Sequence, residues 1–154
     1  MYKVLFVCTA NIFRSRFSEE VFNFLAKKNN IKAMAFSAGL KVGAYISRTI
    51  YPPALEYLNI YGIEPQRKDE LSTHINKLNL NDYQKIICLD EVEHKPMVVE
   101  NNKLNKISIT YWDIVDEPKM SRSISLPKCY KKVEELIKSL ENNHIHKNID
   151  KLNN

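Results

Sequence analysis

The sequence predicts a three-layer α/β fold, in which a four-stranded parallel sheet is flanked by helices. Short apolar runs alternate along the chain with segments whose apolar residues recur at helical spacing. Strands separated by helices connect through right-handed crossovers, and such connections give a parallel sheet. The chain has 154 residues, of which 44% are hydrophobic and 27% charged, so it is expected to fold as one globular domain.

The first half of the chain is expected to supply two strands and two helices. The apolar run at residues 4–7 predicts a buried strand, and residues 32–37 predict a shorter one. Between them, residues 17–25 carry apolar side chains at i, i+4, i+7 and i+8, which form one stripe of a helix. A proline pair and Gly62 predict the start and end of a helix over residues 52–62.

The second half is expected to complete the sheet and to end in a helix. Residues 71–78 form a weaker helical segment, residues 85–89 predict a central buried strand and residues 106–109 a fourth strand. From about Pro127 the apolar pattern is the most regular helix of the chain. We therefore expect a domain over residues 1–141.

Composition limits the location and the partners. Residues 142–154 are rich in Asn, Lys and His and are expected to form a frayed polar tail. No apolar stretch approaches the length of a membrane span, and three cysteines fit a reducing compartment, so a cytoplasmic location is expected. The net charge is +5, but the basic residues are dispersed, which argues against a nucleic-acid partner. The four histidines show no spacing typical of a metal site, and no metal or cofactor is expected.

The most informative segment is the loop from Cys8 to Arg14, between the first strand and the first helix. Backbone N–H groups in such a loop and at a helix start bind anions such as phosphate. Arg14 can bind two phosphate oxygens as a planar fork. The same positive field favours the thiolate of Cys8, the nucleophile needed to attack a phosphate ester, and Ser15 can donate a hydrogen bond to it.

Both key residues also have an ordinary explanation. A cysteine at the end of an apolar strand is usually an inert core residue, and an arginine at a helix start is usually a solvated charge. The setting favours the phosphate loop, because a strand precedes Cys8, a helix follows Arg14 and Ser15 comes next.

With these residues the chain resembles the low-molecular-weight protein tyrosine phosphatases over roughly residues 3–140. The most specific part is the segment Val-Cys-Thr-Ala-Asn-Ile-Phe-Arg-Ser at residues 7–15, close to the amino terminus as in that family. Weaker marks follow in the family's order and spacing, at residues 36–39, 53–55, 61–63, 86–90 and 112–118.

The resemblance implies a metal-free, two-step phosphoryl transfer through a phosphocysteine at Cys8. Arg14 and the loop amides would hold the oxygens that gain charge, while Asn11 would brace the loop and Ser15 would support the thiolate. It also implies phosphotyrosine proteins as substrates, inorganic phosphate as product and, by association, a bacterial tyrosine kinase as partner. The loop residues expected around the phosphate are Thr9, Ala10, Asn11, Ile12, Phe13 and Ser15.

The family uses a general acid, an aspartate directly before a proline on a later loop. Here Glu117 stands between Asp116 and Pro118. Asp116 is favoured because it lies where the family aspartate falls counting from Trp112, and Asp113 and Glu117 are the alternatives. All three would be ordinary loop acids if none serves this role.

Three departures from the family concern the loop and the start of the helix after it. Ala10 stands where glycine is common, and it would cost about 1 kcal/mol if this position needs a positive φ. Phe13 replaces a second cysteine, so oxidised Cys8 would lack a nearby thiol. Arg16 replaces a proline and would add a cation near the mouth of the site.

The substrate slot is expected to have an apolar rim, for which Ile12, Leu40, Tyr45 and Tyr111 are candidates. An aromatic residue often follows the Asp-Pro pair in the family, but Lys119 stands here, so that wall of the slot is expected to be missing.

Two alternatives stay open. One is an arginine phosphatase of similar fold, although that enzyme prefers a smaller, hydroxyl-bearing residue at Ile12, and the other is a module that binds phosphate without turnover. An arsenate reductase of this fold is disfavoured, because it would need two further cysteines and the one expected a few residues after Cys88 is absent.

Overall fold

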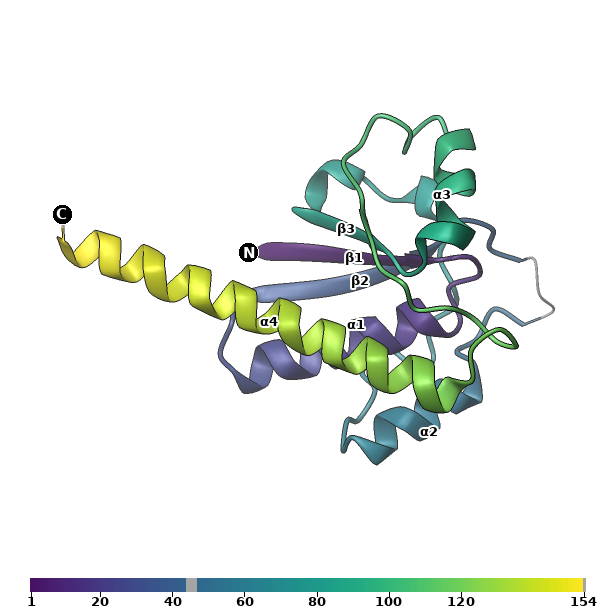
Figure 1. Ribbon diagram of the computed structural model, residues 1–154, viewed down its shortest axis with the longest axis horizontal. Helices are drawn as coiled ribbons and strands as arrows, with labels where there is room; N and C mark the ends of the chain where they lie inside the picture. Colours follow the sequence, from purple (N-terminus) through teal and green to yellow (C-terminus); the bar gives the residue numbers. More distant parts are fainter. Residues whose placement is uncertain (44–46, 154) are drawn as a thin grey trace.

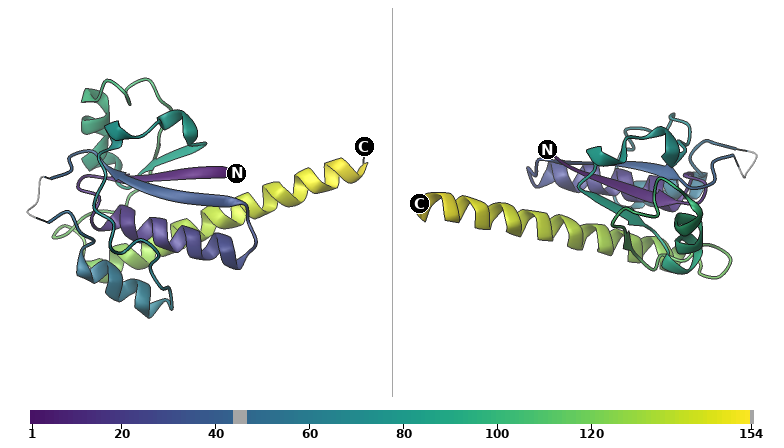
Figure 2. Two further views of the ribbon diagram at one scale, coloured as in Figure 1. Left: turned by 180° about the vertical axis from the view of Figure 1, so that it is seen from behind. Right: turned by 90° about the horizontal axis from the view of Figure 1, so that it is seen from above.

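A computed structural model describes residues 1–43 and 47–153, with the backbone alone for residues 144–151. This part of the chain contains one parallel sheet of four strands in the order β2-β1-β3-β4, with helices on both faces (Figures 1 and 2). The predicted fold class is confirmed. The strands are β1 (Tyr2–Cys8), β2 (Ala33–Gly39), β3 (Lys85–Cys88) and β4 (Thr110–Tyr111).

The helices divide between the two faces of the sheet. In Figure 1, α1, α2 and α4 lie below the strands, whereas α3 lies above them. Two short 3₁₀ turns, Ile75–Lys77 and Leu80–Asp82, precede β3. The helices are α1 (Arg14–Lys28), α2 (Pro52–Ile60), α3 (Glu91–Glu100) and α4 (Arg122–Asn153).

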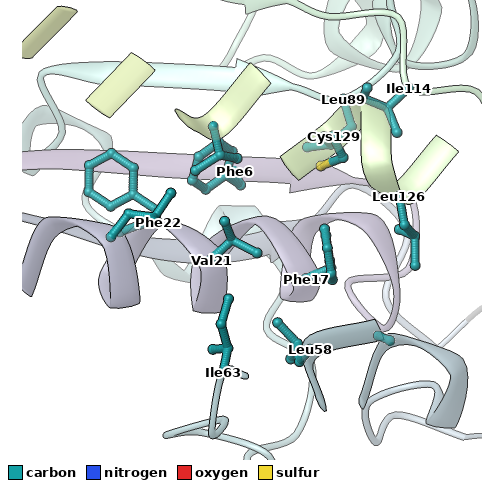
Figure 3. Close-up of a cluster of buried hydrophobic side chains, with 14 of the residues drawn as sticks. Phe6, Phe17, Val21, Phe22, Leu58, Ile63, Leu89, Ile114, Leu126 and Cys129 are labelled. Atoms are coloured by element: carbon teal, nitrogen blue, oxygen red, sulfur yellow. The ribbon is translucent and has the colours of Figure 1, made fainter. Parts of the chain in front are cut away.

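The alternation of side chains along β1 builds two cores. Val4 and Phe6 join the larger core with α1, α2 and α4, part of which Figure 3 shows, while Leu5 and Val7 join a smaller one under α3. All four side chains are fully buried, as expected for a central parallel strand covered on both faces. The two cores therefore hold the end of β1 on both faces of the sheet, and the loop that follows β1 begins at a well-packed position.

Two predicted elements need correction, and one helix was missed. The fourth strand is Thr110–Tyr111 and not residues 106–109, because the chain there turns and the Ile107 N–H bonds to the carbonyl of Leu104. Within residues 71–78 only Ile75–Lys77 is helical. Helix α3 was not predicted, because its buried side chains are only His94 and Val98.

The end of α4 also differs from the prediction. The helix continues to Asn153, so the frayed tail predicted from residue 142 is helical and that boundary falls inside α4. In Figure 1 this end of α4 projects beyond the start of β1. No helix in the described ranges combines the length and the apolarity that crossing a membrane requires.

Candidate active site

The loop of residues 8–14, here called the Cys8 loop, lies at the carboxyl edge of the sheet, where parallel α/β folds bind ligands. The chain after β2 holds its first residues, since the N–H groups of Leu40 and Lys41 donate to the carbonyls of Cys8 and Thr9 at 2.9 and 2.8 Å. Gly39 permits this approach, because a Cβ there would lie 2.8 Å from the Thr9 carbonyl oxygen.

Asn11 occupies the inside of the loop. Its Oδ1 accepts from the Thr73 N–H at 3.0 Å, which identifies the oxygen end of the amide, and its Nδ2 donates to Ser15 Oγ at 2.8 Å. Asn11 also has the left-handed φ of 59°, a conformation that asparagine tolerates. Ala10 has no positive φ, so the strain considered for it from the sequence does not arise.

The sulfur of Cys8 is buried and has two hydrogen-bond partners. It lies 2.9 Å from Ser15 Oγ and accepts from the Asn11 N–H at 3.3 Å. Because the amide of Asn11 donates to Ser15, the hydroxyl hydrogen of Ser15 is available to the sulfur. Both groups can thus donate a hydrogen bond to the sulfur.

Arg14, the last residue of the Cys8 loop, is buried and keeps its positive charge. Nη1 donates to the Ile114 carbonyl at 3.0 Å, while Nη2 donates to Glu93 at 2.7 Å and lies 3.4 Å from Asp116 Oδ2. Burial lowers the pKa of Arg14, but Cys8, Glu93 and Asp116 outweigh it, so the net pKa is raised.

The three candidate acids have different surroundings. Asp116 lines the cavity at the Cys8 loop. Glu117 lines it too, but both of its oxygens pair with Arg122, at 2.5 and 2.9 Å. Asp113 is 65% exposed, does not line the cavity and pairs with Lys128 at 2.9 Å, whose hydrogen bond lowers the pKa of Asp113. Of the three, Asp116 is thus the carboxylate that lines the cavity without being paired to a cation of α4.

The cavity itself has a volume of about 330 Å³. Of the predicted rim residues Ile12 lines it, whereas Leu40 and Tyr111 belong to the core under α3. Tyr45 lies outside the described residues. The lining residues are Cys8, Thr9, Ala10, Ile12, Phe13, Arg14, Tyr51, Asp116 and Glu117.

Tyr51 is a lining residue that sequence analysis missed. Its ring meets Phe13 edge to face at 5.1 Å, and the guanidinium of Arg122 lies 5.4 Å from its centroid. Its N–H donates to the Ile12 carbonyl at 2.7 Å. Tyr51 therefore gives the slot an aromatic wall despite Lys119. The available signal was Pro52, because a residue before proline is held extended and outside the helix.

Arg16 does not lie at the mouth of the cavity, so that expectation is wrong. Its side chain is 2% exposed, and its Nη2 donates to the Arg67 carbonyl at 2.7 Å. Burial lowers the pKa of Arg16.

Glu93 is a second residue that sequence analysis missed. It follows β3 in α3, and its Oε2 accepts from Thr9 and Arg14 of the Cys8 loop and from His94. Burial alone would raise the pKa of Glu93, but hydrogen bonds from His94, Arg14 and Thr9 hold it well below the usual range. The sequence did carry one signal for Glu93: it follows β3, the strand that pairs with β1 and so ends beside the Cys8 loop.

The parallel α/β fold, with a cysteine and an arginine in the loop after β1, is typical of cysteine-dependent phosphatases. Comparison of the sequence with known families identifies the family. The family model for low molecular weight phosphotyrosine protein phosphatase matches residues 3–151. The chain belongs to this family. No curated protein matches it.

Solved structures share its fold. YfkJ from Bacillus subtilis is 25% identical, with a TM-score of 0.79 over 93% of this chain and 96% of its own. The low molecular weight protein tyrosine phosphatase from T. tengcongensis is 24% identical, with a TM-score of 0.70 over 93% and 99%. The YwlE arginine phosphatase is 18% identical, with a TM-score of 0.68 over 92% and 94%. An arsenate reductase shares the fold as well.

Proposed function

We propose that this phosphatase-family protein hydrolyses phosphotyrosine in proteins through a phosphocysteine at Cys8. The observation that carries the proposal is the placement of the Cys8 sulfur, the Arg14 guanidinium and the Asp116 carboxyl at one cavity. These three groups supply a nucleophile, a binder of phosphate oxygens and a proton donor.

The reaction proceeds in two displacements at phosphorus. In the first, the Cys8 thiolate forms a P–S bond while the P–O bond to tyrosine breaks, and protonated Asp116 gives its proton to the leaving oxygen. In the second, the Asp116 carboxylate takes a proton from a water molecule whose oxygen attacks phosphorus. The P–S bond breaks, inorganic phosphate leaves and Cys8 is a thiolate again. Arg14 and the loop N–H groups hold the charged oxygens throughout.

The walls of the cavity favour an aromatic phosphate ester. Ile12, Phe13 and Tyr51 present apolar and aromatic surface along it. A phenyl ring can pack against such walls while its phosphate lies on the Cys8 loop. We further propose cytoplasmic phosphotyrosine proteins as substrates, with a tyrosine kinase as the enzyme that supplies them.

Two related activities have weaker support. An arginine phosphatase of similar fold prefers a smaller, hydroxyl-bearing residue at position 12, where Ile12 lines the cavity. An arsenate reductase would need a second accessible thiol, but Cys88 and Cys129 are fully buried.

Hydrolysis of p-nitrophenyl phosphate and of phosphotyrosine and phosphoarginine peptides, without added metal, tests the proposal. Cys8→Ser should abolish turnover, and Asp116→Asn should lower kcat by about 100- to 10,000-fold. Asp113→Asn is the control, and its kcat should equal that of wild type.

Other outcomes would change the assignment. Faster turnover of phosphoarginine than of phosphotyrosine would reassign the substrate. An active Asp116→Asn variant would reassign the acid. A folded wild type whose melting temperature rises with phosphate but that does not turn over would be a binding module.

A further inference from the structure

Glu93 approaches Arg14 from a different element than Asp116 does. It lies on α3, whereas Asp116 lies between β4 and α4. Its Oε2 accepts from Arg14 Nη2 at 2.7 Å, from Thr9 Oγ1 at 2.5 Å and from His94 Nε2 at 2.8 Å. One carboxylate oxygen therefore joins the first residue after the nucleophile to the arginine that ends the loop.

His94 fixes the orientation of Glu93. Its ring is fully buried, and its Nδ1 accepts from the Asp90 N–H at 3.1 Å. In the neutral ring the hydrogen is therefore on Nε2, which points at Glu93 and lies 3.2 Å from Thr9 Oγ1. The backbone at the start of α3 thus orients the His94 ring so that its Nε2–H donates to the Glu93 carboxylate.

The contacts of Arg14 show what Glu93 controls. The Ile114 carbonyl holds Nη1 and Glu93 holds Nη2, so the guanidinium has one hydrogen-bond acceptor on each terminal nitrogen. Its other N–H groups remain for phosphate oxygens. Asp116 lies farther from Nη2 than Glu93 does, at 3.4 Å against 2.7 Å. Arg14 thus already lies within ion-pair distance of Asp116, and without Glu93 the proposed acid Asp116 would become its nearest carboxylate.

We propose that Glu93 is a positioning residue, which holds Arg14 in place for the transferring phosphoryl group and keeps its closest carboxylate contact on Glu93 rather than on Asp116. The proposal rests on the phosphatase function above. It requires a hydrogen-bond acceptor at position 93, held by His94, rather than a negative charge as such.

The test compares Glu93→Ala, Glu93→Gln and wild type in steady-state kinetics and in vanadate binding by calorimetry. Glu93→Ala should lower kcat by about 100-fold, with a smaller effect on KM, because Arg14 is misplaced. The loss should be larger for phenyl phosphate than for p-nitrophenyl phosphate, because the poorer leaving group depends more on the acid. Glu93→Gln keeps an acceptor oxygen and should recover most of kcat.

Glu91→Gln is the matched control, since Glu91 is on the same helix but exposed and pairs with Lys95 at 3.5 Å. Melting curves confirm that each variant is folded. If wild type itself fails to turn over, the phosphatase function fails, and vanadate binding still tests Glu93. Glu93→Ala should then bind vanadate about 10-fold more weakly than wild type. A folded Glu93→Ala variant with unchanged vanadate affinity, or a Glu93→Gln variant as impaired as Glu93→Ala, would overturn the proposal.

Discussion

The three carboxylates of the loop before α4 show what single residues decide. All three lie within five positions, and counting along the chain favours Asp116 without saying which side chain turns inward. The partners decide: Lys128 pairs with Asp113 and Arg122 with Glu117. Both partners come from α4, so the choice depends on tertiary contacts that no local pattern encodes.

The residues that sequence analysis missed have the same origin. Glu93 meets Thr9 across 84 positions of the chain, and Tyr51 meets Arg122 across 71. By contrast, Cys8, Asn11, Arg14 and Ser15 were predicted because they lie within eight consecutive residues, at the Cys8 loop and the start of α1. Local motifs were therefore predictable, whereas Glu93 and Tyr51, which contact the loop from distant parts of the chain, were not.

Phe13 leads to a prediction about oxidation. The other two thiols are poor partners for an oxidised Cys8, because burial raises the pKa of Cys88 and of Cys129 to about 12 and disulfide formation needs a thiolate. Peroxide should inactivate the enzyme, and a thiol reductant should restore little activity. The measurement is the fraction of activity regained, and Phe13→Cys should regain more. Full recovery of wild type would contradict this.

Among the elements, the strands and helices with strong patterns were predicted and those with weak patterns were not. The apolar run of β1 precedes the Cys8 loop and the amphipathic α1 follows it, so the sequence predicted both limits of the loop. Helix α3 buries only two side chains and contains Pro96, so it has little helical pattern. Strand β4 has two residues, too few for any alternation to identify it.

The junction of β2 with the Cys8 loop gives a prediction at this scale. Gly39→Ala would bring a Cβ within 2.8 Å of both the Thr9 carbonyl oxygen and Val42 Cγ2. The Thr9 carbonyl belongs to the backbone and cannot move aside as easily as a flexible side chain. The variant should therefore lose about 1–3 kcal/mol of unfolding free energy and should have a lower kcat. Chemical denaturation and kinetics measure both.

Gly62→Ala is the control for that variant. Gly62 has a φ of +70°, and a Cβ added there would meet nothing within 4 Å, so alanine should cost about 1 kcal/mol through backbone strain alone. Its turnover should match wild type. Equal kinetics in both variants would contradict the account of Gly39.

For the molecule as a whole, a buried carboxyl makes stability depend on pH. Glu19 is fully buried and accepts from Arg67 at 2.6 Å, yet burial dominates and raises its pKa from 4.5 to about 6. The folded state thus favours the protonated form. This contribution is fully present below pH 4.5 and is lost as the pH rises through about 6.

Glu19→Gln should remove that dependence. Between about pH 4 and pH 7 wild type should lose about 2 kcal/mol of unfolding free energy relative to the variant. Urea denaturation across this range measures the difference. Parallel curves for the two proteins would mean that Glu19 titrates alike in the folded and unfolded states.

The central claim, that Cys8 is the nucleophile, is tested most directly by trapping its phosphorylated form. Wild type is mixed with p-nitrophenyl phosphate and quenched rapidly, and mass spectrometry of its peptides locates the phosphoryl group. The proposed mechanism predicts a phosphoryl group on Cys8 that forms as nitrophenol is released and that is absent from Cys8→Ser. Turnover with no phosphoenzyme, or a phosphoryl group on another residue, would contradict it.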